Sequence, residues 1–413
     1  MSRCWHSCSH SSLRLQATSE SIGKKFGLLP QIEFLIRERG SHQTLKQNHT
    51  RRHTSATQQK NNCKSDNLGD HLGRTYSSAA ALPTIHQVLR KFRDQSADMP
   101  RLSNLDLMKE ADAETLYTLV WKDGSVLGYM LDSVVKQLLA TPEEVRGPVV
   151  VDDAKRTVRA FELPTEAERT ARVAALMAYW RENRTFDILR GWRDELWPVY
   201  GSDTEVLYSV ERSGTGLGGF MRYGVDMTGY VKDETAPHGM KILVAQRAAN
   251  KSTYPGMLDN SVAGGLMTGE DPFECIIREA DEEASVPEAL MRERAKFTGM
   301  VTYIYITDER TGGEAGQIYP ETQWVYDIEL PADFSPMPKD GEVAGFYMWT
   351  VDEVKEKLAE GRFKPNCALI LVDFFIRHKI LTPENEPDYD EILRRLRRKL
   401  PFPGPHQAGP STV

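Results

Sequence analysis

The chain has 413 residues, of which 40% are hydrophobic and 27% are charged, and its formal net charge is −7. This is the composition of an ordinary globular protein, and the length allows two domains or one domain with extensions. The acidic balance excludes a general attraction to nucleic acid or anionic membranes, and no apolar run reaches the roughly 18 residues of a membrane-spanning helix.

The first 80 residues differ from the rest of the chain. They hold 12 Lys or Arg against five acids and are rich in Ser, Thr, Asn, Gln and His, so we expect a disordered basic leader. A basic, Ser-rich and acid-poor leader is typical of a mitochondrial presequence, and residues 74–78 (RTYSS) would place cleavage near Tyr76. An unstructured tail explains the composition equally well. The predicted location is therefore mitochondrial, with the cytoplasm as the alternative.

From residue 84 the pattern becomes globular, and we predict an N-terminal α/β domain over residues 84–230. Helical spacing marks residues 85–92 and 165–181. Three further features are predicted: strands at residues 116–121 and 125–131 joined by the turn KDG, a segment at residues 190–197 that ends at Pro198, and strands at residues 205–210 and 229–231. A Gly-rich link at residues 214–219 lacks the GK[ST] ending of a phosphate-binding loop, which favours a hairpin or an interdomain loop.

A second α/β domain is predicted over residues 231–380, and a C-terminal helix and tail over residues 381–413. The domain opens with an apolar strand at residues 241–246, and the tail carries a basic amphipathic helix at residues 388–400. Within the second domain, the stretch that says most about function is residues 264–286 (GGLMTGEDPFECIIREADEEASV). Asp271 can cap a helix, Pro272 suits its first position and Glu274 would complete a capping box, so we expect a helix from Pro272 to about Ala284.

Two faces of this predicted helix differ in character. Its buried face would carry Phe273, Ile277, Ala280 and Ala284, at about 100° per residue. Another face carries Glu279, Glu282 and Glu283 at positions i, i+3 and i+4, with Arg278 beside them. Like charges at these spacings cost a helix about 0.2–0.5 kcal/mol per pair, and more in a cleft of low dielectric. Converging carboxylates suit Mg²⁺ or Mn²⁺, although an acidic helix face is more often a solvated surface.

The spacing of the whole stretch resembles the Nudix box. Gly264, Glu270, Arg278–Glu279 and Glu282–Glu283 stand where that signature has its Gly, Glu, Arg-Glu and Glu-Glu, and Ser285 departs from the Gly of the family. The resemblance implies an α/β/α sandwich over about residues 230–380. It also implies that Glu279, Glu282 and Glu283 bind metal with help from the carbonyl of Ala263 or Gly264.

The same resemblance implies two further roles. Arg278 would pair with Glu270 and orient the catalytic glutamates. A further acid usually comes from a distant loop, and here Glu342, in residues 339–343 (KDGEV), is the best match. An exposed loop acid is the equal alternative for Glu342.

Three longer segments indicate a subgroup. Residues 191–200 (GWRDELWPVY), 223–225 (YGV) and 254–260 (YPGMLDN) resemble the fungal and plant Nudix proteins called thiamin pyrophosphokinase-related, in which an N-terminal domain of its own type precedes the Nudix domain. The chain departs from this group at Asp226, where His is expected, and it has no room for a kinase domain after the Nudix unit. The group is similar to hydrolases that convert thiamin diphosphates, especially damaged oxo and oxy forms, to monophosphates.

The predicted function is metal-dependent hydrolysis of a phosphoanhydride in a small-molecule diphosphate, with Mg²⁺ or Mn²⁺ as cofactor and neither nucleic acid nor membrane as partner. Glu279 or Glu342 would take the proton of the attacking water. One alternative is a nucleotide substrate such as ADP-ribose or a dinucleoside polyphosphate, and the pocket candidates Trp192, Tyr254 and Tyr303 cannot be ranked from sequence. A second alternative, supported by Ser285 alone, is a catalytically silent binding module.

Overall fold

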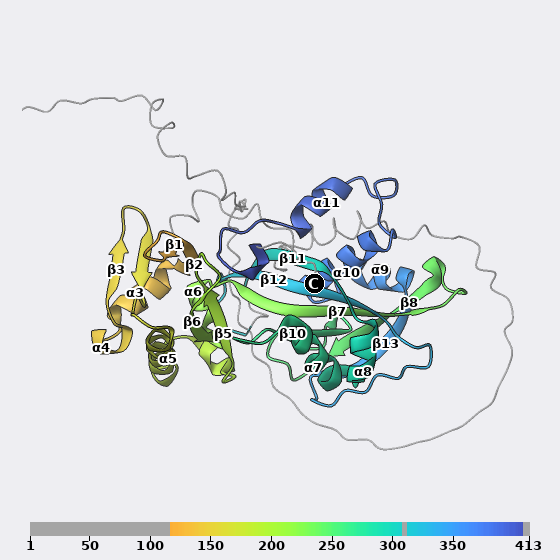
Figure 1. The fold of residues 1–413 in the computed structure, drawn as a ribbon, viewed down its shortest axis with the longest axis horizontal. Helices are drawn as coiled ribbons and strands as arrows, with labels where there is room; N and C mark the ends of the chain where they lie inside the picture. The colour runs from red at the N-terminus through yellow and green to blue at the C-terminus, as the bar shows by residue number, and fades with distance from the viewer. Residues whose placement is uncertain (1–115, 308–311, 408–413) are drawn as a thin grey trace, which may run out of the picture.

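The computed structural model describes residues 116–307 and 312–407. The predicted leader and the predicted helix at residues 85–92 lie outside the described residues, so both stay predictions, as does the mitochondrial location. Figure 1 shows two units side by side, which we call the N-terminal unit (residues 116–221) and the C-terminal unit (residues 222–407). Within the described ranges, no helix is both long and apolar enough to cross a lipid bilayer.

The N-terminal unit is built on a four-stranded sheet of order β2-β1-β4-β3. The predicted hairpin is confirmed, and Asp123 stabilises its turn by accepting a hydrogen bond from the Ser125 amide at 2.9 Å. The predicted long helix is α5, which begins at a Thr165–Glu168 capping box and buries Trp180. The elements of this sheet and its helices are β1 (Leu116–Val120), β2 (Val126–Leu131), α3 (Asp132–Ala140), α4 (Glu143–Arg146), β3 (Val149–Asp152), β4 (Thr157–Ala160) and α5 (Glu166–Glu182).

A two-stranded ladder follows the sheet and leads to the second unit. It pairs β5 (Leu196–Tyr200) with β6 (Val206–Glu211), and the 3₁₀ turn η1 (Asp187–Gly191) precedes it. The predicted end of a segment at Pro198 is wrong, because β5 runs through this proline. The Gly-rich link forms the turn η2 (Arg212–Gly214) and the short helix α6 (Thr215–Gly218). Of the two predicted alternatives, the hairpin is wrong, because β6 and the next strand lie in different sheets, and the link instead joins the two units as the predicted interdomain loop would. A Cβ at Gly216 would collide with Tyr319 of the C-terminal unit, so close packing between the units requires glycine there. A Cβ at Gly219 would collide with the backbone of Tyr129 within the N-terminal unit.

The C-terminal unit contains a seven-stranded mixed sheet. Its main path is β11-β12-β7-β8-β13, with β10 paired to β7 and β9 paired to β8. The strand expected at residues 229–231 is part of the longer β7, which pairs in parallel with β12, and the predicted domain boundary at residue 230 falls inside β7. The strands are β7 (Arg222–Lys232), β8 (Met240–Arg247), β9 (Leu258–Asp259), β10 (Val262–Gly265), β11 (Lys296–Ile306), β12 (Ile318–Glu329) and β13 (Val343–Thr350).

Helices cover both faces of this sheet, which confirms the expected α/β/α sandwich (Figure 1). Ile276 and Ala280 of α7 are buried against one face, and Leu371 and Phe374 of α10 are buried against the other. The C-terminal helix is shorter than the predicted span of residues 388–400. The helices are α7 (Pro272–Ala284) and α8 (Glu288–Arg294) on the first face, and α9 (Val351–Ala359), α10 (Pro365–Arg377) and α11 (Tyr389–Leu396) on the second; the turns η3 (Pro237–Gly239) and η5 (Pro405–Gln407) complete the set.

Candidate active site

Helix α7 spans the residues expected from the sequence and carries the acidic cluster. The Asp271 side chain caps it by accepting hydrogen bonds from the amides of Phe273 (2.8 Å) and Glu274 (3.2 Å). The predicted capping box is wrong, because the Glu274 carboxylate instead makes two hydrogen bonds to Arg292 on α8, at 2.8 and 2.9 Å. Ser285 ends the helix in the left-handed region (φ 54°), and its hydroxyl donates to the Met337 carbonyl. Ser285 therefore adopts the conformation that the family's Gly favours.

The buried face of α7 agrees largely with the prediction. Ile277, Ala280 and Ala284 are buried, while Phe273 is half-buried against the ring of Tyr326. Packing on this side turns the carboxylates of α7 away from the core and toward β10.

Arg278 gathers three carboxylates at one end of the site. It forms ion pairs with Glu270 (2.9 Å), Glu279 (2.9 Å) and Glu282 (3.1 Å). The pair with Glu270 is the one that the box resemblance implies. Its charge offsets the repulsion between Glu279 and Glu282, which face each other across one helical turn. Glu279 also packs on Gly264, where a Cβ would collide with its side chain.

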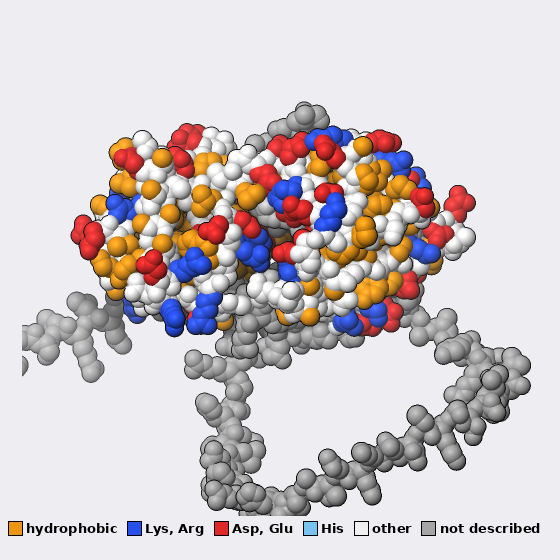
Figure 2. Space-filling view, turned by 90° about the horizontal axis from the view of Figure 1, so that it is seen from below, with side chains coloured by type: hydrophobic (Ala, Val, Ile, Leu, Met, Phe, Trp, Pro, Cys, Tyr) orange, Lys and Arg blue, Asp and Glu red, His pale blue; other side chains and the backbone are white. Residues whose placement is uncertain are grey.

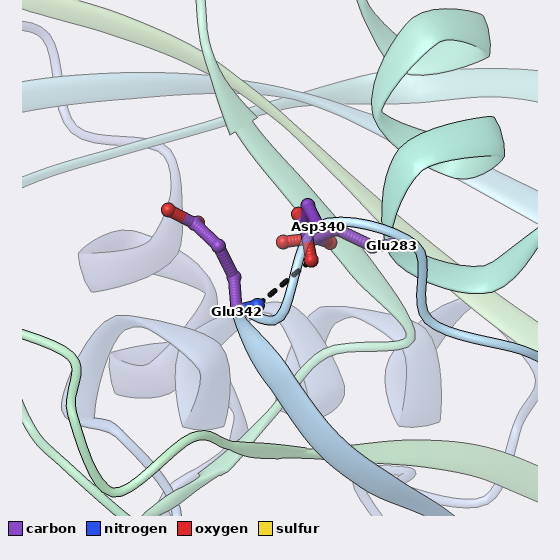
Figure 3. A group of neighbouring side chains, drawn as sticks. All are labelled: Glu283, Asp340 and Glu342. Atoms are coloured by element: carbon purple, nitrogen blue, oxygen red, sulfur yellow. Dashed lines mark hydrogen bonds between the residues drawn. The ribbon is translucent and has the colours of Figure 1, made fainter.

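Glu283 belongs to a different group of carboxylates. It accepts a hydrogen bond from the Ala263 amide at 2.9 Å, and its carboxylate lies with those of Asp340 and Glu342, all within 4.8 Å of one another (Figure 3). The loop that brings Asp340 and Glu342 is closed by a 2.8 Å hydrogen bond from the Glu342 amide to Asp340. The structure thus divides the three predicted glutamates between two neighbouring groups. Sequence reasoning missed Asp340, whose signal was the acidic loop already noted for Glu342.

Both carboxylate groups line one cavity of about 730 Å³ between the two units. Figure 2 shows it as a hollow midway along the molecule, with basic and acidic side chains at its rim. Tyr254 and Tyr303 line this cavity, but Trp192 is not one of its lining residues and lies under the guanidinium of Arg181 instead. The lining residues that carry charge are Arg193, Glu195, Arg212, Arg222, Asp226, Arg247, Lys251, Asp259, Arg278, Glu279, Glu282, Glu283, Glu321, Asp340, Glu342 and Lys364.

The carboxylates near α7 are crowded and poorly solvated. Burial raises the pKa of Glu279 to about 7, against the lowering effect of Arg278. Burial, with the charge of Asp259 added, raises the pKa of Glu283 well above its ordinary value. For Glu342 burial also acts upward, but its ion pair with Lys251 outweighs burial and lowers the pKa. These carboxylates offer only oxygen donors, and burial disfavours their negative charge. A hard dication such as Mg²⁺ or Mn²⁺ fits this site, because it takes oxygen ligands and neutralises that charge.

Another part of the cavity lining combines ion pairs with tyrosine rings. Arg222 pairs with Glu321 at 2.8 Å, and Glu321 accepts a 2.6 Å hydrogen bond from the Tyr303 hydroxyl. Asp226, which replaces the expected His, is buried there and accepts a hydrogen bond from Asn260 at 2.5 Å, and burial raises its pKa to about 7. Apolar ring faces beside a few fixed polar groups are what a planar organic ligand requires.

Comparisons with known proteins match each unit to a family. Residues 229–368 match the NUDIX domain, and residues 100–222 match a domain of unknown function, DUF4743. The uncharacterized protein YJR142W of Saccharomyces cerevisiae is 32% identical over 327 residues, which cover 75% of this chain and 95% of that protein.

Two relatives from Arabidopsis thaliana are also similar to this chain. Nudix hydrolase 20, chloroplastic, is 37% identical over 51% of this chain and 54% of that protein. Nudix hydrolase 24, chloroplastic, is 36% identical over 51% of this chain and 55% of that protein. The chain thus spans about half the length of these plant relatives.

Proposed function

This chain belongs to the Nudix family of pyrophosphate hydrolases, and on that premise we propose that it converts thiamin diphosphate, or oxidised forms of it, to the monophosphate and phosphate. The observation that carries the proposal is one cavity that is lined both by the α7 carboxylates and by tyrosine rings. Its carboxylates and arginines suit a metal-bound diphosphate, and its tyrosine rings suit a planar heterocycle. The thiamin class itself is supported by the resemblance of residues 191–200, 223–225 and 254–260 to the thiamin pyrophosphokinase-related group.

We assign the metal ligands to the carboxylates that surround the end of α7. Glu282, Glu283 and Glu279 would hold the metal together with the carbonyl of Ala263 or Gly264, and Asp340 joins them because its carboxylate lies beside that of Glu283. When bound, Mg²⁺ or Mn²⁺ supplies charge neutralisation for the diphosphate and a water of lowered pKa.

The remaining roles follow from the pKa of the two candidate bases, which burial raises to about 7 in Glu279 and which Lys251, against the effect of burial, lowers in Glu342. Glu342 contacts both Lys251 and Arg193, so its negative charge is largely committed. Glu279 is held by Arg278 and by its packing on Gly264, with its carboxylate facing the cavity. We therefore assign Glu279 as the group that takes the proton of the attacking water and Arg278 as the residue that positions it.

A panel of diphosphates tests the substrate class. Thiamin diphosphate, its oxo and oxy forms, ADP-ribose and a dinucleoside polyphosphate are each incubated with the full chain and Mg²⁺, and phosphate or monophosphate release is measured. We expect the thiamin compounds to have the highest kcat/KM. A higher value for ADP-ribose or the dinucleoside polyphosphate would transfer the proposal to nucleotides, and metal-dependent binding without turnover would indicate a silent binding module.

A further inference from the structure

The N-terminal unit, which matches a domain of unknown function, forms one wall of the cavity. Arg193, Trp197, Arg212 and Ser213 all come from this unit and all line the space that the α7 carboxylates face. The question is therefore what this wall does for a ligand held between it and α7.

The two segments that carry these residues are held together at the end of the β5–β6 ladder. The Arg212 amide donates to the Glu195 carbonyl at 2.8 Å. The buried carboxylate of Glu211 accepts hydrogen bonds from the amides of Arg193 (2.9 Å) and Ser213 (3.2 Å). The backbone segments that carry the guanidinium groups of Arg193 and Arg212 are thus held in place by hydrogen bonds, some of them to the charged carboxylate of Glu211.

The same ladder is fastened to the loop that leads into α7. The Leu196 carbonyl accepts a 2.9 Å hydrogen bond from the Thr268 amide, and the Ser209 and Thr268 hydroxyls are 2.9 Å apart. The Trp197 ring lies so close to Gly265 that a Cβ there would collide with it. The spacing between the N-terminal wall and the α7 carboxylates is therefore set by direct contacts rather than by a flexible linker.

The arginines of this wall lie close to acids of the C-terminal unit. Arg193 lies 3.7 Å from Glu342, and the charge of Arg212 acts on both Glu279 and Glu342. Arg212 is held over the Trp197 ring, 5.3 Å from its centroid, and by a 2.9 Å ion pair with Glu195. The side chain of Arg193 is 36% exposed and that of Arg212 is 34% exposed. Both guanidinium groups therefore have N–H donors that a ligand can reach.

Ser213 adds an independent observation. Ser213 lines the cavity, and its hydroxyl oxygen is buried and has no hydrogen-bond partner among the described residues. A buried hydroxyl without a partner costs about 1–3 kcal/mol, so such groups usually meet a ligand or water.

We infer that Arg193, Arg212 and Ser213 of the N-terminal unit bind the diphosphate of the substrate in the cavity that the α7 carboxylates also line. The inference rests on the proposed function and adds to it a role for the first unit. Arginine presents several donors in a planar fork that matches phosphate oxygens, and a serine hydroxyl donates one more. The diphosphate would then contact arginines of the N-terminal unit as well as the metal that the α7 carboxylates would hold.

The test compares Arg193→Gln and Arg212→Gln with the matched control Arg190→Gln in the full chain. Arg190 is in the same unit, and its exposed side chain pairs with Asp187. Two quantities are measured: kcat and KM for thiamin diphosphate with Mg²⁺, and the Kd of the non-hydrolysable methylenediphosphonate by titration calorimetry. We expect both cavity variants to raise KM and Kd by roughly 10- to 100-fold, as for a lost charge-assisted hydrogen bond, and the control to change neither.

Arg212→Lys guards against loss of folding, because it keeps the charge and the alkyl stem over Trp197 but removes the fork. Thermal unfolding of each variant identifies any that fails to fold. If folded Arg193→Gln and Arg212→Lys bind the diphosphonate as the wild type does, the inference is overturned even when the wild type hydrolyses thiamin diphosphate. If the wild type hydrolyses no diphosphate but these variants lose diphosphonate binding, the proposed function fails and the binding role stands.

Discussion

Glu282 and Glu283 are neighbours in sequence, yet their carboxylates have different surroundings. Glu283 is held by the Ala263 amide and lies with Asp340 and Glu342. The side chain of Glu282 is 47% exposed and pairs with Arg278. The exposed residue can therefore be changed with little effect on packing, which makes it the better probe of the chemistry.

We predict that Glu282→Gln abolishes turnover while the fold survives. The loss should be at least about 100-fold, since even groups behind a metal ligand contribute about 10- to 100-fold. The free energy of unfolding should change by no more than about 0.5 kcal/mol, as for most exposed positions. Steady-state kinetics and urea unfolding measure the two quantities, with Glu293→Gln on α8 as the control. A folded, fully active Gln variant would contradict the assignment of the site.

Local spacing was sufficient to predict that Glu279, Glu282 and Glu283 share one face of a helix, because i, i+3 and i+4 positions need no knowledge of the rest of the fold. Spacing alone favoured a solvated face, and the metal-binding role of these residues, like the role of Arg278, was implied by the resemblance to the Nudix box. The division of the glutamates and the participation of Asp340 depend on where the loop before β13 returns. That return is set by the pairing of β13 with β8, about a hundred residues earlier in the chain, and no local pattern encodes it.

At the scale of elements, α7 shows where local signals suffice and where they fail. Asp271, Pro272 and the stripe of apolar residues fix both of its ends, because capping and periodicity act within a few residues. Glu274 had two possible partners, the helix start and Arg292 on α8, and the two-bond pair with Arg292 prevails. The sequence left a hairpin and an interdomain loop as alternatives for the Gly-rich link, and local signals could not decide between them, because the packing of its glycines against Tyr319 and Tyr129 involves distant parts of the chain.

The observed cap leads to a prediction for Asp271→Ala. Loss of the hydrogen bonds to the Phe273 and Glu274 amides should lower the free energy of unfolding by about 1 kcal/mol. Asp281→Ala, at an exposed position of the same helix whose partner is Lys339, should change it by no more than about 0.5 kcal/mol. Urea unfolding of both variants beside the wild type measures the difference. Equal effects would mean that general charge on α7, and not the cap, is responsible.

At the scale of the whole molecule, the C-terminal segment after α11 connects the two units. Phe402 is 1% exposed and packs edge-on against Tyr129 of the N-terminal unit, with ring centroids 5.5 Å apart. Gly404 and His406 continue this contact onto Tyr223 of β7, which lines the cavity. Such a contact between distant parts of the chain could not be predicted from the tail's composition, which indicates only a helix followed by prolines.

Phe402→Ala tests whether this segment holds the units together. Truncation of a fully buried Phe should lower the free energy of unfolding by about 3–5 kcal/mol. Phe297 is 40% exposed, so Phe297→Ala should lower the free energy of unfolding by far less. Denaturant unfolding measures both, and kcat/KM measured below the transition reports on the cavity. A cost for Phe402→Ala no larger than that for Phe297→Ala would show that the segment packs without stabilising the assembly of the two units.

His406 gives the same segment a predicted dependence on pH. Burial lowers the pKa of His406 from its ordinary 6.5 to about 4, because the charged imidazole would lose its hydration. The titratable group that faces it is Tyr223, whose hydroxyl lies 3.4 Å from Nδ1 and whose pKa burial raises well above its ordinary value, so Tyr223 does not titrate in this range.

The sign of the effect follows from which state binds the proton first. His406 is protonated near pH 6.5 in the unfolded chain and near pH 4 in the folded protein. The contribution of the buried, neutral imidazole to the free energy of unfolding is therefore complete above pH 6.5 and is lost as the pH falls toward 4. Between pH 7.5 and pH 5 the wild type should therefore lose more stability than His406→Gln, since the carboxylates titrate alike in both. Urea unfolding at the two pH values measures this difference. Equal losses of the free energy of unfolding in the two proteins would show that His406 is solvated in the folded state and is not buried against Tyr223.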